Sequence, residues 1–429
     1  MMVIYFTMLP SFVTKYLQTR AVQGPWSLSG HGGDGFSGAV VVPALAEYDN
    51  LFNTLQRLAA NPPELLSRFF VLVVVNHRED ARKEDKEDNR RTLERLCARE
   101  PELSPLNLVW VDAASQGLEM PAKGGGVGLA RKIGLDLALS HLHFSDRKPL
   151  LICLDADTWV EPLYLPAIEA HFNLTECGGA VVPFCHRPGD TPAEHEAIER
   201  YELFLRSYVL GLYLAGSPYA FHTVGSAMAS TADAYIRMGG MNRRIAAEDF
   251  YFLQQLHRTS GVEQVRGTTV YPSPRPSHRV PFGTGRSISR YLRGDTNVIM
   301  FYHPECFRIL GEWLRMIKNG LYRDGTDLMA EAASISPSLE EYLELSSFTA
   351  SWLRLRKNNG NNNALLKAFH VWFDALRTLK LINHLSEWRH PRCGPEKAVA
   401  PLLKWGGLPI PEGETAKLFL LRELQNGTR

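Results

Sequence analysis

The amino-acid sequence predicts an α/β fold, in which a mostly parallel sheet is covered by helices and is followed by an α-helical C-terminal region. Short, continuously apolar segments alternate with segments of helical periodicity in the first part of the chain. Such alternation is typical of parallel sheets that are buried on both faces. After about residue 300 no strand-like segment occurs, and apolar residues recur at helical spacing.

Four short apolar segments are expected to form the parallel strands. They are residues 39–43, 69–75, 108–111 and 149–154. Helical spacing predicts helices over residues 50–60 and 128–140, and the charges of residues 77–100 predict a solvated loop and surface helix. Ligands of such sheets bind beyond the carboxyl ends of the strands, so the residues that follow each strand are the candidates for a site.

Three regions are expected along the chain. Residues 1–37 are predicted to be an irregular N-terminal segment, residues 38–300 the sheet domain, and residues 301–429 the α-helical region. The periodic segments of the last region are residues 306–321, 339–357 and 363–387.

The composition excludes some classes of function. Lys and Arg number 47 and Asp and Glu number 46, so no strong overall field attracts nucleic acid. The six cysteines lack paired spacing, which favours reduced thiols. No segment reaches the roughly 18 apolar residues of a spanning helix. Residues 208–221 are expected to be a buried helix that ends near Gly216, with a peripheral membrane contact as the alternative. We expect a cytoplasmic protein.

Two carboxylates follow the fourth expected strand. Asp155 and Asp157 are separated by one residue and come directly after residues 149–154. Oxygen-rich sites of this kind suit Mn²⁺ or Mg²⁺, which keep waters and bind substrate phosphates. The alternative is a pair of acids that cap the next element. Their position at the end of a buried strand favours the metal site.

A glycine-rich segment precedes the helix that is expected from residue 128. Glycines at residues 124–128 would let backbone N–H groups approach an anion at the helix N-terminus, and Lys123, Arg131 and Lys132 add positive charge. The segment is not a P-loop, because no Gly-Lys-Ser/Thr occurs. A tight loop that enters a helix is the alternative.

Two further segments carry candidate chemistry. Glu248 and Asp249 open an amphipathic helix, where they either cap the helix or present a general base. Residues 275–286 contain His278, a possible metal ligand, together with cationic side chains and a Gly-Thr-Gly sequence. A loop that closes over phosphates has this composition, and so does a plain surface loop.

The order of these motifs along residues 38–290 resembles that of the GT-A glycosyltransferases, most closely those of family 2. The resemblance does not extend to the C-terminal region. The matching residues are Val40-Val41-Val42-Pro43 with Glu47, Ala130-Arg131-Lys132-Ile133-Gly134, Asp155-Ala156-Asp157, Gly239-Gly240, Glu248-Asp249 and His278.

The resemblance implies a metal-dependent, inverting transfer of a sugar from a nucleotide-diphospho-sugar donor. The acceptor would be a hydroxyl of a carbohydrate, a lipid-linked molecule or a small molecule. Asp249 would be the catalytic base. Mn²⁺ or Mg²⁺ would be held by Asp155, Asp157 and His278. The acceptor would be bound by Glu248, Gly240 and Ser226. The donor nucleotide would be bound by Pro43, Glu47, Asn76, Lys123, Arg131, Lys132, Asp155, Arg279 and Arg286.

One motif departs from the family. The second strand ends in Val75-Asn76-His77-Arg78, where the family has Asp-Asp-Gly-Ser, so the nucleotide base is left open. One alternative is a nucleotidyltransferase that acts on sugar phosphates, although its glycine-rich loop would follow the first strand, where residues 44–47 lack glycine. The other is a non-catalytic nucleotide-sugar-binding protein on a degenerate transferase fold.

Overall fold

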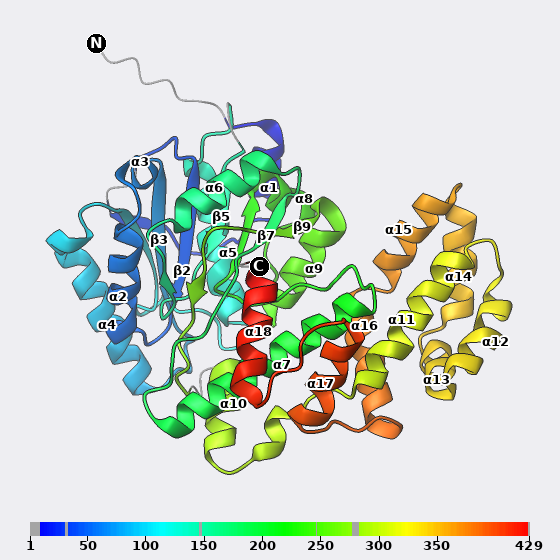
Figure 1. Ribbon diagram of the computed structural model, residues 1–429. Coiled ribbons are helices and arrows are strands. Elements are labelled where there is room, and N and C mark those ends of the chain that lie inside the picture. Colours follow the sequence, from blue (N-terminus) through cyan, green and yellow to red (C-terminus); the bar gives the residue numbers. More distant parts are fainter. Residues whose placement is uncertain (1–8, 31–32, 146–147, 246, 277–282, 428–429) are drawn as a thin grey trace. The chain divides into compact units, whose positions relative to one another are not determined.

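The computed structural model describes residues 9–30, 33–145, 148–245, 247–276 and 283–427. The chain divides into two compact units, which are called here the sheet unit and the helical unit (Figure 1). The sheet unit comprises Met1–Arg187 and Thr223–Gly283, and the helical unit comprises Pro188–His222 and Thr284–Arg429.

The sheet unit is built on one mixed sheet, whose strands lie in the order β1-β4-β3-β2-β5-β8-β7-β9. The four central strands from β4 to β5 are parallel, whereas β1 and β8 run antiparallel to their neighbours. The strands are β1 (Leu28–Gly30), β2 (Gly38–Ala44), β3 (Phe69–Asn76), β4 (Asn107–Ala113), β5 (Leu150–Cys153), β7 (Gly179–Val181), β8 (Met228–Thr231) and β9 (Val262–Gln264). A small second sheet pairs β6 (Trp159–Val160) with β10 (Val270–Tyr271).

The predicted architecture, a mostly parallel sheet covered by helices with further helices after it, is confirmed. All residues of β3 are buried, as expected for a strand covered on both faces. Helix α5 (Val127–Ala138) packs on β2 and β3, and Gly134 permits this approach. A Cβ atom at Gly134 would lie 2.4 Å from Val41 Cγ1, so a larger residue would push the helix off the sheet.

Helix α1 lies in a segment of the sheet unit for which the sequence predicted no regular structure. Residues 1–37 were expected to be irregular, but they contain α1 and β1, because Val13 and Tyr16 of α1 are buried. Besides α5, the helices of the sheet unit are α1 (Ser11–Thr19), α2 (Tyr48–Ala59), α3 (Pro63–Leu66), α4 (Lys83–Ala98), α6 (Tyr164–Leu174), α8 (Ala232–Met238) and α9 (Glu248–Ser260). Short 3₁₀ helices span Pro101–Leu103 and Leu139–His141.

The helical unit consists of helices in the part that the structure describes. Two predicted helices are each divided in two: Ser347 adopts a positive φ of 53° within 339–357, and Asp374 caps a new helix within 363–387. The helices are α7 (Pro192–Leu214), α10 (Thr284–Leu292), α11 (Pro304–Asn319), α12 (Gly325–Ile335), α13 (Pro337–Leu345), α14 (Phe348–Asn358), α15 (Asn362–Trp372), α16 (Ala375–Trp388), α17 (Pro395–Trp405) and α18 (Glu414–Asn426). A 3₁₀ helix spans Thr296–Ile299.

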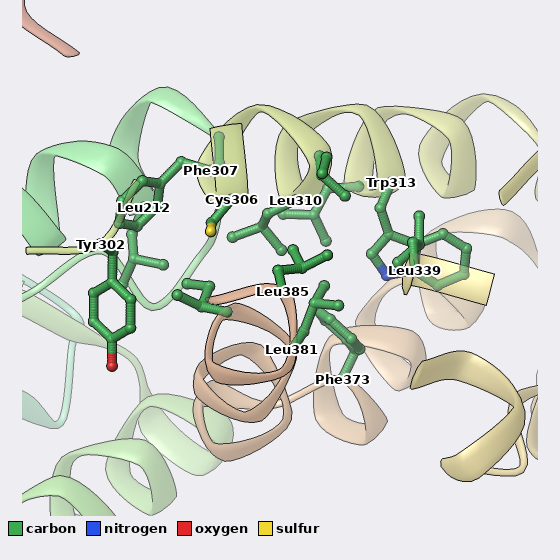
Figure 2. Packing of buried hydrophobic residues seen from close by; sticks show 14 of the residues in the cluster. Leu212, Tyr302, Cys306, Phe307, Leu310, Trp313, Leu339, Phe373, Leu381 and Leu385 are labelled. Atoms are coloured by element: carbon green, nitrogen blue, oxygen red, sulfur yellow. The ribbon is translucent and has the colours of Figure 1, made fainter. Parts of the chain in front are cut away.

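Helix α7 belongs to the helical unit, whereas the sequence prediction placed its residues inside 38–300. Its buried residues Leu203, Leu210 and Leu212 join the same apolar cluster as residues of α11 and α16. Figure 2 shows Leu212 beside Phe307 of α11 in this cluster. The helix ends at Leu214, before Gly216, which confirms the buried helix predicted for residues 208–221. Among the described residues, no helix is both long and apolar enough to cross a membrane.

Replacing Trp313 of α11 tests the packing of the apolar core of the helical unit. It is fully buried, and its ring lies 5.0 Å from that of Phe348, 5.9 Å from that of Phe369 and 6.1 Å from that of Phe373, between centroids. Trp313→Ala should lower the unfolding free energy by about 3–5 kcal/mol, since it removes these contacts and leaves a cavity. Urea unfolding followed by circular dichroism measures the loss. Phe419→Ala, at a side chain that is 61% exposed, is the control and should change little. If Trp313→Ala and Phe419→Ala lowered the unfolding free energy equally, the packing described for Trp313 would be contradicted.

Candidate functional site

The four parallel strands end at one edge of the sheet, and acidic residues follow two of them. Glu47 comes three residues after β2 and stands at the start of α2. Asp155 and Asp157 follow β5, which pairs directly with β2. The carboxyl ends of neighbouring parallel strands meet at the same edge, so these three carboxylates are brought together by the fold.

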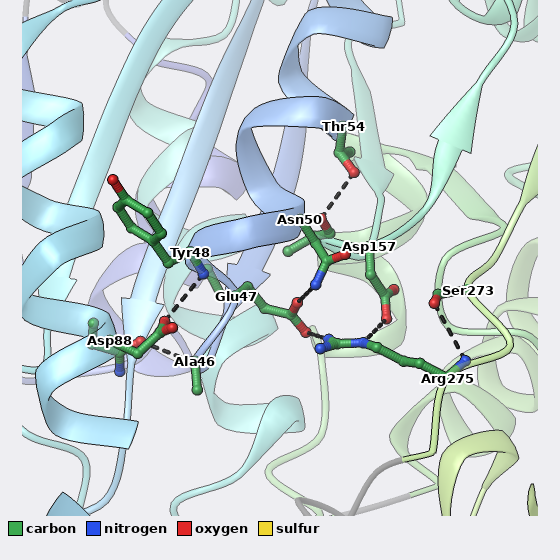
Figure 3. A network of polar contacts seen from close by, with 12 residues as sticks. Ala46, Glu47, Tyr48, Asn50, Thr54, Asp88, Asp157, Ser273 and Arg275 are labelled. Carbon is green, nitrogen blue, oxygen red and sulfur yellow. Dashed lines mark hydrogen bonds and ion pairs between the residues drawn. The ribbon is translucent and has the colours of Figure 1, made fainter. Parts of the chain in front are cut away.

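Arg275 joins two of these carboxylates (Figure 3). Its Nη2 donates to Glu47, and its Nε donates to Oδ2 of Asp157 at 3.1 Å. The side chain of Glu47 is only 8% exposed, and Asn50 donates a further hydrogen bond to it at 3.1 Å. Burial alone would lower the pKa of Arg275, but the charges of Glu47 and Asp157 outweigh it and raise that pKa. Arg275 therefore keeps its positive charge at this edge of the sheet.

The sequence did not single out Arg275. It lies in the 275–286 segment that was expected to close over phosphates, but only His278, Arg279 and Arg286 were named there. His278 and Arg279 lie outside the described residues. Arg286 is exposed on α10 and belongs to the helical unit.

Arg131 joins the third carboxylate to the start of α9. This side chain is 2% exposed, and its Nη2 and Nη1 form ion pairs with Asp155 and Glu248 respectively. Burial opposes its charge, but Asp155 and the other acidic groups nearby, Asp249 among them, together outweigh burial and raise the pKa of Arg131. Gly225, which lies just before β8, packs directly against Arg131, since a Cβ atom at this glycine would lie 2.5 Å from Nη2 of Arg131. Ser226 is buried beside this glycine.

Asp249 follows Glu248 in the first turn of α9. One of its oxygens accepts a hydrogen bond from the backbone N–H of Phe250 at 2.7 Å, and its side chain remains partly exposed. The protein around the carboxylate shields it from water and so raises the pKa of Asp249. The charge of Asp155 raises this pKa further, whereas the charge of Arg131 lowers it. A partly exposed carboxylate with a raised pKa is a suitable proton acceptor.

Lys132 and Gly240 belong to a different, buried network. The ammonium of Lys132 lies 2.8 Å from Asp136 and donates to the hydroxyl of Tyr16 at 3.2 Å. Asp136 also accepts hydrogen bonds from Tyr16 at 2.8 Å and from Tyr235 at 2.7 Å. A Cβ atom at Gly240 would lie 1.8 Å from the Tyr16 oxygen. These contacts give Lys132 and the second glycine of Gly239-Gly240 a structural purpose in anchoring α1.

Asn76, at the end of β3, is also used inside the protein. It is 3% exposed, and its amide donates to the carbonyl oxygens of Ala44 at 3.2 Å and Val74 at 2.9 Å. The carbonyl of Asn76 accepts from the amide of Asn89 at 2.9 Å. The side chain therefore ties β3 to β2.

His77 is buried next to Asn76. Its Nδ1 lies 3.0 Å from the amide nitrogen of Asn89, which only donates, so Nε2 carries the proton of the neutral ring. Burial, followed by the charge of Lys86, lowers the pKa of His77 and keeps the ring neutral. Its Nε2 has no hydrogen-bond partner among the described residues.

The glycine-rich segment is explained by packing. A Cβ atom at Gly126 would lie 2.8 Å from Ile245 Cα, and one at Gly128 would lie 2.4 Å from the carbonyl oxygen of Arg244. The start of α5 is thus in contact with the backbone of residues 244–245. Lys123 stands exposed at the head of the segment.

Two arginines flank Trp159, which the sequence also did not indicate. The guanidinium carbons of Arg57 and Arg187 lie 4.7 Å and 4.2 Å from the Trp159 ring centroid. Arg187 also donates to the carbonyl oxygen of Asp157 at 3.1 Å. Since β6 begins two residues after Asp157, these contacts help to fix the loop between β5 and β6. Pro43, in β2, is half-buried on the neighbouring strand.

Comparisons with known proteins give structural neighbours only. No family model and no curated protein sequence matches the chain. A mannosyltransferase, PcManGT from Pyrobaculum calidifontis, solved with GDP-Man and Mn²⁺, is 16% identical, over 96% of this chain and 92% of that chain, with a TM-score of 0.37. S. aureus TarS 1-349, solved with UDP-GlcNAc, is 13% identical, over 91% of each chain, with a TM-score of 0.36.

A third structure, GalNAc-T7 with UDP, GalNAc and Mn²⁺, is 13% identical, over 56% of this chain and 44% of that chain, with a TM-score of 0.35. All three neighbours are named or solved as proteins that hold nucleotides or nucleotide sugars. At these levels of likeness, an activity for this chain has to be argued from its own residues.

Arg131→Gln tests the link between β5 and α9. The change leaves Glu248, which is 5% exposed, as a buried carboxylate without its cation. It should lower the unfolding free energy by about 3–5 kcal/mol, measured by urea denaturation. Arg237→Gln, which removes an ion pair between exposed side chains, is the matched control and should have little effect. If the two variants unfold alike, Arg131 does not hold this part of the site together.

Proposed function

We propose that the chain is a glycosyltransferase of the GT-A type, which transfers a sugar from a nucleotide-diphospho-sugar to an acceptor hydroxyl. The observation that carries the proposal is the shared contact of Arg131 with Asp155 and Glu248. It places the acids after β5 beside those that open α9. This proximity supports a single site that contains both the proposed metal ligands and the proposed base, as a single-displacement, inverting transfer would require.

Asp155 and Asp157 are the proposed ligands of Mn²⁺ or Mg²⁺. Their side chains are 35% and 21% exposed, so solvent and a substrate can reach them. The described residues contain no group of three or more side chains that could hold a metal. Two carboxylates nevertheless fit these ions, which usually complete their coordination with waters and substrate phosphates. A bound ion would supply charge neutralisation for the leaving diphosphate.

The proposed donor site is supported by residues of two kinds. Pro43 and the exposed Lys123 lie on or after the elements that form the carboxyl edge, and they remain candidates for direct contact. Glu47 lies at the same edge, but it would have to exchange its partner Arg275 to contact a donor. Arg131, Lys132 and Asn76 have their polar groups engaged within the protein. For Arg131 and Asn76 we propose a supporting role beneath the donor, whereas Lys132 anchors α1 through Asp136 and Tyr16.

Asp249 is the proposed general base. Its raised pKa makes the carboxylate a better proton acceptor than an ordinary aspartate, and Glu248 beside it is held by Arg131. Glu248, Gly240 and Ser226 were predicted to bind the acceptor. Since Glu248 and Ser226 are buried, we propose that they shape the acceptor site rather than reach far into it.

Asp249→Asn tests the base. The variant should bind the donor as the wild type does and lose transfer or donor hydrolysis by about 10²–10⁴-fold, because the amide cannot accept the proton. UDP-GlcNAc and GDP-mannose with Mn²⁺ are the donor probes, binding is measured by thermal shift, and turnover by release of nucleoside diphosphate.

Asp233→Asn, at an exposed aspartate of α8, is the control and should retain turnover. Near-wild-type turnover of Asp249→Asn would remove this residue from the base role. Donor binding without any turnover in the wild type would favour the alternative of a non-catalytic nucleotide-sugar-binding protein.

Arg275→Gln tests the metal site. Arg275 occupies one oxygen of Asp157, so a cation that binds there must compete with the guanidinium. Loss of one charge-assisted hydrogen bond corresponds to a change of about tenfold or more. The variant should therefore bind Mn²⁺ about tenfold more tightly by calorimetry without nucleotide. Arg258→Gln, at an exposed residue of α9, is the control. An unchanged Mn²⁺ affinity in Arg275→Gln would contradict a metal at Asp157.

A further inference from the structure

One stretch of the helical unit is basic and has no acidic residue. Residues 345–373 contain four cationic side chains and no Asp or Glu, although the whole chain is nearly neutral. All four are exposed, and none forms an ion pair with a residue that the structure describes. They are Arg354, Arg356, Lys357 and Lys367. The positive charge of this stretch is therefore directed to solvent.

Three of these cations lie on the exposed half of α14. Phe348 and Trp352 point to the core of the helical unit and are buried. At about 100° per residue, Leu353 and Lys357 lie on the opposite side of the helix. Ala350 also lies on this side, and Arg354 and Arg356 lie at its two margins, about 160° apart around the helix axis. These five residues are called here the basic face of α14.

The basic face has an exposed apolar centre. Leu353 is 70% exposed, which is unusual for a leucine in the middle of a helix whose other face is well packed. Two more apolar side chains of the same acid-free stretch are exposed: Leu345, at the end of α13, is 73% exposed, and Val371, on α15, is 39% exposed. The stretch therefore combines apolar side chains with unpaired cations.

We infer that the basic face of α14 docks the helical unit on an anionic lipid bilayer. Helices that lie in a membrane interface carry Lys and Arg on their polar part and bury apolar side chains at the boundary between headgroups and acyl chains. Anionic headgroups attract each nearby Lys or Arg. Arg354, Arg356 and Lys357 would contact the headgroups, and Leu353 would enter the boundary.

The apolar centre favours lipid over nucleic acid. Proteins neutralise nucleic-acid phosphates with cations and hydrogen-bond donors, and a leucine amid those cations offers nothing to a phosphate. In a bilayer, the same leucine removes apolar surface from water. The inference does not depend on the proposed transferase activity, because binding to lipid needs neither donor nor acceptor.

Co-sedimentation of the full chain with vesicles tests the inference. The chain should bind vesicles of phosphatidylcholine mixed with phosphatidylglycerol, should bind phosphatidylcholine alone much more weakly, and should lose binding at high salt. The triple variant Arg354→Gln, Arg356→Gln, Lys357→Gln should bind the mixed vesicles about a hundredfold more weakly. Leu353→Ser should bind them a few-fold more weakly with all charges kept.

The control removes the same number of charges from exposed residues of the sheet unit. Lys83→Gln with Arg258→Gln and Arg266→Gln should leave binding unchanged. Circular dichroism melting verifies that each variant is folded. The inference is overturned if the wild type ignores the mixed vesicles, if the control loses as much binding as the triple variant, or if Leu353→Ser binds as the wild type does. Preferential capture by duplex DNA over vesicles would overturn it as well.

Discussion

The candidate site depends on the buried guanidinium of Arg131. Asp155 follows β5 and Glu248 begins α9, and these two elements are separated by about a hundred residues of chain that include α6, β7, α7 and α8. A cation that is 2% exposed and pairs with both acids makes their separation costly, because Glu248, which is 5% exposed, would be left as a buried carboxylate without its cation. The same ion pairs set the electrostatic surroundings of Asp249, whose pKa reflects burial and the opposing charges of Asp155 and Arg131.

A second arginine performs the corresponding task at the outer part of the edge. Arg275 is 30% exposed, so its pairs with Glu47 and Asp157 are weaker constraints than those of Arg131. The buried Arg131 therefore holds its two acids permanently, whereas the more exposed Arg275 can exchange its partners. An incoming metal ion or diphosphate would have to rearrange Arg275, whereas Arg131 can stay in place.

The sequence predicted the central sheet well and the site only in part. Continuous apolar segments identify β2, β3, β4 and β5, because strands buried on both faces leave no room for polar side chains. Roles that depend on distant partners could not be read this way. Lys132 meets Tyr16 across 116 residues, and Arg275 meets Glu47 across 228 residues. A basic residue near a glycine-rich loop has the same local pattern whether it faces a ligand or a buried acid.

The backbone is strained just before α2 and α9, a feature that the sequence pattern did not indicate. Ala46 and Ala247 have positive φ angles of 51° and 57°, and each immediately precedes an acidic residue of the site, Glu47 and Glu248. Left-handed alanine is less favourable than glycine, at a cost of order 1 kcal/mol or more. At both places the chain makes a sharp entry into a helix without a side-chain cap from the preceding residue. Because both acids are then held by arginines, their ion pairs stabilise the strained entries, and the two halves of the site are built by the same means.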